Sequence, residues 1–143
     1  MSTRQFCTFY LDQLYLGVDV LQVQEVIRFQ EMTRIPLAHR MIRGLINLRG
    51  QIVTALDLRL RLELPGETSE SSFMNVIINT HDAPVSLMVD EIGDVLELGD
   101  EQFEPPPQHL NVGLKKMIKG VYKLDDDFLL ILNTEKATDL ENK

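Results

Sequence analysis

The 143-residue chain is long enough to bury a hydrophobic core, and 44% of its residues are apolar. Only 6% of the residues are aromatic and none is Trp, so this core must rest on Val, Ile and Leu. The formal net charge of −8 argues against nucleic acid and anionic membrane surfaces as main partners. The length predicts one domain over residues 1–143, or two small lobes that share the chain.

No stretch reaches the roughly 18 uninterrupted apolar residues of a membrane span, so we expect none. The first residues also lack the apolar segment and small-residue cleavage site of a signal peptide. Cys7 is the only cysteine, which fits a reducing compartment. These features predict a cytoplasmic protein in which Cys7 packs as a small apolar residue.

The charges are unevenly distributed along the chain. Residues 28–61 contain seven Arg and two acidic residues, which gives a net charge of +5. Residues 62–113 contain eleven Asp or Glu and neither Lys nor Arg, which gives −11. Either folding intermixes these charges, or the protein carries one basic and one acidic surface suited to docking on other proteins or to head-to-tail packing.

The N-terminal segments predict strands. Residues 6–11 form the first strand, and residues 14–20 form a mostly apolar second one. Residues 20–27 fit a helix or a short turn followed by a strand, and their β-branched content favours the turn and strand. Residues 38–43 are predicted to form one helical turn that ends at Gly44.

Residues 44–58 have the clearest pattern, because apolar side chains recur there mainly at every second position. This period indicates strands with one buried face. Gly50 is suited to a tight turn that requires positive φ. We predict two strands joined at Arg49 and Gly50, with one long bulged strand as the alternative. Arg49 is then either an ordinary solvated turn residue or a guanidinium presented to a partner.

The remaining segments predict hairpins. Residues 65–72 form a polar loop between the two halves of the sequence. Hairpins follow over 73–89 and 118–132, and Asn133 is a plausible N-cap for a short helix that reaches about Leu140. Eight to ten short strands with little helix predict an all-β barrel or sandwich, and the division near the loop suits two small barrels.

No catalytic or metal-binding constellation is evident. The three histidines lie in turn or proline-rich segments, without a partner at metal-ligand spacing. The sequence has no Walker A, G-x-S-x-G or G-x-G-x-x-G motif. We therefore expect no enzyme activity, cofactor or metal, and the pattern favours protein–protein contact.

The sequence resembles the CheW family of chemotaxis coupling proteins. The likeness runs in order from about residue 5 to 140, and its most specific part is the N-L-R-G element at 47–50. The matching segments are Phe6 to Leu11, GVDV at 17–20, VQEV at 23–26, TRIP at 33–36, GLINLRGQIV at 44–53, LDLR at 56–59, VDEIGDVL at 89–96, PPP at 105–107, IKGV at 118–121 and LILNTEK at 130–136.

The resemblance implies two intertwined five-stranded SH3-like barrels with one or two short helices, one of them C-terminal. It implies a non-enzymatic adaptor that joins the cytoplasmic tip of methyl-accepting chemoreceptors to the regulatory domain of a CheA-type histidine kinase. Such a protein associates with receptor arrays through its partners and binds neither nucleic acid nor the membrane directly. A small ligand-binding or enzymatic barrel with an unrecognised pocket is the alternative, and chemosensory pathways other than swimming chemotaxis stay open.

The resemblance also assigns residues. Val23, Glu25, Val26 and Arg49 match the receptor contact, although core packing of the valines and simple solvation of Glu25 remain alternatives. Kinase contacts are expected at Ile52 and at a turn containing Gly120. Gly44 and Gly50 are expected to shape structural turns.

Overall fold

The computed structural model describes residues 2–28, 30–66, 73–81 and 83–140. These residues form eleven β-strands in two sheets, with three short α-helices and two 3-10 turns. The all-β prediction is confirmed. Most of the predicted 65–72 loop lies outside the described residues, so its place between the halves stays a prediction.

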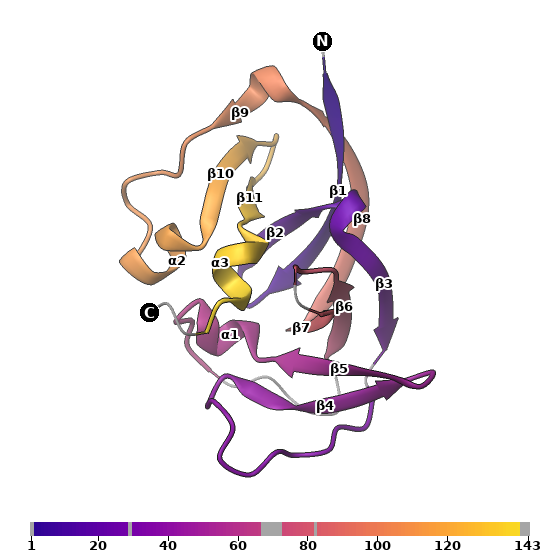
Figure 1. Cartoon of the computed structure of the whole chain (residues 1–143). Helices are drawn as coiled ribbons and strands as arrows, with labels where there is room; N and C mark the ends of the chain where they lie inside the picture. Colours follow the sequence, from indigo (N-terminus) through magenta and orange to yellow (C-terminus); the bar gives the residue numbers. More distant parts are fainter. Residues whose placement is uncertain (1, 29, 67–72, 82, 141–143) are drawn as a thin grey trace.

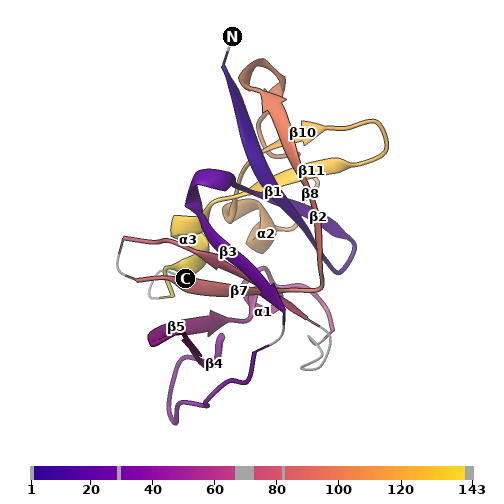
Figure 2. The same cartoon turned by 90° about the vertical axis from the view of Figure 1, so that its right-hand side faces the viewer.

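The first sheet is built from both ends of the chain. Its strand order is β8-β1-β2-β11-β10-β9. The strands are β1 (Thr3–Leu11), β2 (Leu14–Asp19), β8 (Glu91–Gly99), β9 (Phe103–Glu104), β10 (Ile118–Lys123) and β11 (Phe128–Leu132). Neighbours pair antiparallel except β2 and β11, which are parallel. The upper half of Figure 2 shows most of this sheet.

The second sheet is built from the middle of the chain, with order β3-β6-β7-β5-β4. Its strands are β3 (Val23–Arg28), β4 (Ile42–Leu48), β5 (Gln51–Leu56), β6 (Met74–Ile78) and β7 (Val85–Val89). The chain thus leaves the first sheet after β2, completes the second sheet, and returns at β8 (Figure 1). This path explains why the two halves are intertwined rather than consecutive.

Three short α-helices connect the strands: α1 (Leu58–Arg61), α2 (Val112–Lys116) and α3 (Thr134–Thr138). Each begins after an Asp or Asn whose side chain accepts a backbone N–H of the first turn. The accepted bonds run from Leu60 to Asp57 at 3.1 Å, from Leu114 to Asn111 at 2.7 Å, and from Lys136 to Asn133 at 3.1 Å. The predicted C-terminal helix is therefore confirmed, whereas α1 and α2 were not predicted.

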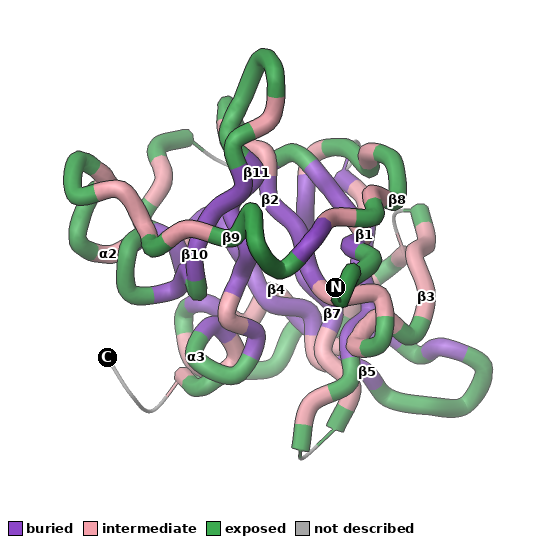
Figure 3. Tube along the Cα trace, turned by 90° about the horizontal axis from the view of Figure 1, so that it is seen from above, coloured by how far each residue is buried: buried purple, intermediate pink, exposed green. Residues whose placement is uncertain are grey.

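The core has three parts because both sheets bury both faces. A central cluster lies between the sheets and includes Phe9, Leu16, Val76 and Leu87. A second cluster lies inside the barrel formed by the second sheet. A third lies inside the barrel formed by the first sheet. In Figure 3 the buried segments gather at the centre while most connecting loops are exposed. Each fully buried aliphatic side chain stabilises the folded state by about 1.5–3 kcal/mol. The three-part core favours two sheets that curve into small SH3-like barrels.

Several local predictions are wrong. Residues 38–43 form no helix, because β4 already begins at Ile42 and only a turn precedes it, closed by a bond from Ile42 N–H to the His39 carbonyl at 2.8 Å. Gly44 lies within β4 rather than in a turn. Glycine is required there because of close backbone approach, since a Cβ would lie 2.8 Å from the Thr33 carbonyl oxygen. Gly44 therefore lets the segment at Thr33 pair with β4 through Leu45.

Gly120 also lies in a strand rather than a turn. It belongs to β10, next to the shift in register opposite β11. A Cβ at Gly120 would lie 2.4 Å from the Phe103 ring and 2.5 Å from the Glu104 carbonyl oxygen. Gly120 is buried because β9 passes directly over it, so Phe103 rather than Gly120 presents a side chain at this surface.

Candidate functional site

The site begins at the two-residue turn between β4 and β5. Arg49 has φ 51° and Gly50 has φ 88°, and the last strand pair is Leu48 with Gln51. Positive φ at both central residues is typical of the type I′ turn that suits the twist of a hairpin. Asn47 supports the turn, because its Oδ1 accepts the Gly50 N–H at 3.0 Å. The predicted hairpin is confirmed, and the bulged single strand is excluded.

This turn reaches across the barrel to β3. Arg49 Nη2 forms an ion pair with Glu25 Oε2, and Gln24 Nε2 donates to Gln51 Oε1 at 3.2 Å. Because β3 and β4 are the opposite edges of the second sheet, these contacts close the barrel by side chains. The hydrogen bond from Arg49 to Glu25, and then the carboxylate charge, raise the pKa of Arg49 above its ordinary value. Arg49 remains a cation under all working conditions.

The pair is presented to solvent. The Arg49 side chain is 68% exposed and that of Glu25 is 24% exposed. An ion pair this exposed contributes little to stability and is screened by salt. The guanidinium of Arg49 keeps donors available for a second carboxylate or carbonyl group, because Arg carries five N–H donors.

Val23 and Val26 lie on the same strand as Glu25 but face another way. A bulge at Gln24 shifts the register of β3 against β6. The two valines are half-buried and pack against the central cluster, whereas Glu25 pairs with Ile77 of the second barrel's interior. The structure therefore joins Glu25 directly to Arg49, and it leaves the valines partly exposed on the other side of an edge strand.

Two exposed apolar side chains lie on other parts of these elements. Ile52 is 55% exposed on β5, directly after the hairpin turn. Leu21 is 88% exposed in the 3-10 turn η1 (Val20–Gln22) that leads into β3, and it lines a hollow together with Phe103. Sequence reasoning missed Leu21, although its place between two strand segments was a usable signal. Exposed apolar groups of this kind suit contact with another protein.

Nothing among the described residues resembles a metal site, since no group of three or more His, Cys, Asp and Glu side chains is positioned to hold an ion. Cys7 is partly buried, and this burial raises the pKa of its thiol. In the described part of the chain no helix is long and apolar enough to cross a membrane.

Two sheets that curve into small barrels, joined by short helices, define an all-β domain of the SH3-like class. A family model described as CheW-like domain matches residues 5–141. The chain therefore belongs to the CheW-like family.

Named relatives agree with this assignment. The chain is 30% identical over 138 residues to "Chemotaxis protein CheW" of Klebsiella aerogenes, covering 96% of this chain and 83% of the relative. It is 30% identical over 126 residues to the protein of the same name from Bacillus subtilis, covering 88% and 81%. The solved scaffolding protein TtCheW from Thermoanaerobacter tengcongensis superposes with a TM-score of 0.88 at 25% identity, covering 99% of this chain and 97% of that one. This likeness confirms the two-barrel fold.

Proposed function

We propose that the chain is a non-enzymatic adaptor that couples chemoreceptors to a CheA-type histidine kinase. It works in the cytoplasm and reaches receptor arrays through its partners. The observation that carries the proposal is the Arg49–Glu25 pair, which holds a cationic fork at the edge of a barrel where it is open to solvent. The scaffold name of the structural relative and the chemotaxis names of the sequence relatives support it.

The receptor tip is a pair of antiparallel helices, and Arg49 suits a carboxylate or a backbone carbonyl on it. Glu25 orients the guanidinium. Val23 and Val26 supply apolar contact along β3. Hot-spot residues of interfaces are enriched in Arg and surrounded by apolar contacts that exclude water.

The kinase contact is proposed on the remaining exposed apolar groups. Ile52 is open to a partner beside the hairpin. Near Gly120 the accessible group is Phe103, which is 41% exposed and packs against Tyr122 with ring centroids 5.3 Å apart. Gly120 acts there by letting β9 approach β10.

A charge-exchange experiment tests the receptor contact. The single variants Arg49→Glu and Glu25→Arg, and the double exchange, are compared in pull-downs with a receptor cytoplasmic fragment. If Arg49 meets the receptor directly, the double exchange restores the internal ion pair but not receptor binding. Full recovery in the double variant would mean that the pair only closes the barrel, and would overturn the contact assignment.

A second pull-down uses the regulatory domain of a CheA-type kinase. Ile52→Asp and Phe103→Asp are expected to weaken kinase capture, because a carboxylate in a desolvated apolar contact is unfavourable. Both variants should still bind the receptor fragment. Unchanged kinase capture by both would contradict this assignment.

A further inference from the structure

A pocket of about 580 Å³ lies where the two barrels meet, away from the proposed receptor surface. Its walls come from the segment before β4, from the end of α1, from α2, and from Leu140 just beyond α3. In Figure 1 these helices lie on the left, whereas β3 and the β4–β5 turn lie on the right. Pockets of 300–1,000 Å³ are typical of small-molecule sites, so this volume is sufficient for a small organic ligand.

The polar groups in this pocket are mainly donors. Arg40, Arg61 and Lys116 line it and are faced by one carboxylate, that of Glu63. Arg61 is buried and held in place, since it donates to the carbonyl oxygens of Ala137, Lys136 and Asp139 at 3.0, 2.7 and 2.8 Å. The lining is thus cationic in a protein whose formal net charge is −8. This reversal of sign favours an anion.

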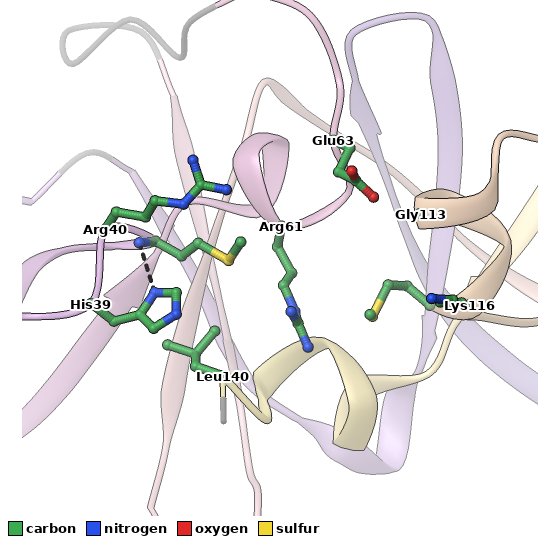
Figure 4. A pocket seen from close by; sticks show the side chains of 9 residues that line it. His39, Arg40, Arg61, Glu63, Gly113, Lys116 and Leu140 are labelled. Atoms are coloured by element: carbon green, nitrogen blue, oxygen red, sulfur yellow. Dashed lines mark hydrogen bonds between the residues drawn. The ribbon is translucent and has the colours of Figure 1, made fainter. Parts of the chain in front are cut away.

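His39 adds another donor. Its Nδ1 accepts the Met41 N–H at 3.2 Å, as the dashed line in Figure 4 marks. The acceptor role of Nδ1 places the proton of the neutral ring on Nε2. Figure 4 shows the ring at the pocket wall beside Leu140. The Nε2–H of His39 is therefore the group that this ring offers to a ligand.

Glu63 lies away from the Arg40 and His39 end of the pocket (Figure 4). A Cβ on Gly113 would lie 1.6 Å from Glu63 Oε2, so the carboxylate rests against the first turn of α2. Figure 4 shows Glu63 at the Gly113 end of the pocket, separated from His39 and Leu140. The absence of a side chain at Gly113 gives the carboxylate this position.

The rest of the wall is apolar and adaptable. Met41 and Met117 line the pocket with 8% of each residue exposed, and Leu140 lies near His39. Thioether side chains adjust to ligands of irregular shape. The wall therefore matches a short hydrocarbon body, and the donors match an anionic head group.

We propose that this pocket binds a small amphipathic organic anion, with its carboxylate or other acidic head near Arg40 and His39 (Figure 4) and its apolar body against Met41 and Met117. The ligand contacts elements of both barrels, and so it stabilises their junction. This binding is independent of the receptor and kinase contacts.

Sodium hexanoate is the probe, and hexanamide is its neutral counterpart of equal shape. Titration followed by two-dimensional amide NMR should give saturable shifts at residues 39–41 and 113–117 with hexanoate. The charge reversal Arg40→Glu should weaken hexanoate binding roughly tenfold, as expected for the loss of a charged contact. Lys115→Glu is the matched control, because Lys115 is exposed on α2 but does not line the pocket.

Four outcomes would overturn the proposal: no saturable shifts with hexanoate, equal binding of hexanamide, equal effects of Arg40→Glu and Lys115→Glu, or an unchanged wild-type melting temperature at saturating hexanoate. Circular dichroism of each variant establishes that it is folded. Addition of hexanoate should raise the melting temperature of the wild type but not of Arg40→Glu.

Discussion

Two regions of the chain segment that carries the second sheet contain arginines in opposite environments, one exposed and one buried. At the β4–β5 turn, Arg49 is exposed and pairs with a single carboxylate across the barrel seam. At α1, Arg59 and Arg61 are buried, and each binds several groups far away in the sequence. The surroundings of an arginine, rather than its presence in a matching motif, therefore decide whether it stabilises the fold or is available to bind a partner.

The two buried arginines, Arg59 and Arg61, link the two barrels. Arg59 Nη2 binds both carboxylate oxygens of Asp90, at 3.0 and 2.8 Å, where the chain returns to the first sheet. The Asp12 N–H donates to the same Asp90 carboxylate at 2.7 Å. Arg61 attaches α1 to the C-terminal end of α3. A cation at the carbonyl end of a helix is favourable, as for Arg61 at α3. Arg59 and Arg61 together fix the relative position of the barrels.

The largest effect is expected for Arg61→Met. This change leaves three carbonyl groups without their donor and detaches α3, so the free energy of unfolding should fall by roughly 3–4 kcal/mol. Urea denaturation measures this loss. Arg40→Met is the matched control on the exposed surface and should leave stability nearly unchanged. A loss below about 1 kcal/mol for Arg61→Met would show that the buried guanidinium does not hold the barrels together.

Arg59→Met should have a smaller effect. The Asp90 side chain that loses its partner is 33% exposed, so water replaces part of the interaction. We expect a loss of about 2 kcal/mol in the free energy of unfolding. Receptor capture should persist at temperatures where the variant is folded. A variant that is fully stable but unable to bind the receptor fragment would move Arg59 from the structural group to the docking group.

Gly50→Ala tests the hairpin that presents Arg49. An added Cβ meets no atom within 4 Å, so the cost comes only from φ 88°. Left-handed backbone costs a residue with a Cβ about 1–2 kcal/mol. Gly50→Asn should cost less, because Asn tolerates this conformation better. Equal stability of wild type and Gly50→Ala in thermal unfolding would show that the turn adopts another shape.

The smallest effect concerns salt. The exposed Arg49–Glu25 pair is open to screening, since the Debye length is about 10 Å at 0.1 M salt. Higher salt should weaken receptor capture while the stability loss of Arg61→Met stays nearly constant. Receptor capture that is insensitive to salt would indicate a contact carried by Val23 and Val26 alone.

Much of the fold was predictable because local signals were strong. The period of two around Gly50 gave the hairpin, and Asn133 gave the start of α3. The short turn before β3 followed from β-branched content. In contrast, α1 has only four residues, and Leu58 continued the apolar alternation of β5, so the N-cap Asp57 was overlooked.

The site was predictable in part. The family resemblance pointed to Glu25 and Arg49, but their ion pair depends on curvature that brings opposite edges of a sheet together. Gly44 and Gly120 were assigned to turns, because a sequence does not distinguish a glycine needed for positive φ from one needed for close approach of another strand. The roles of Val23, Val26 and Ile52 in partner binding stay predictions.

We expect Arg49 to bind a partner rather than to stabilise the fold. Calorimetric titration of Arg49→Ala with a receptor cytoplasmic fragment, beside its urea unfolding curve, tests this most directly. The affinity should be at least about tenfold weaker, as for loss of an interface hot spot, with an unchanged unfolding midpoint. Wild-type affinity, or a loss of affinity that only follows a loss of stability, would contradict it.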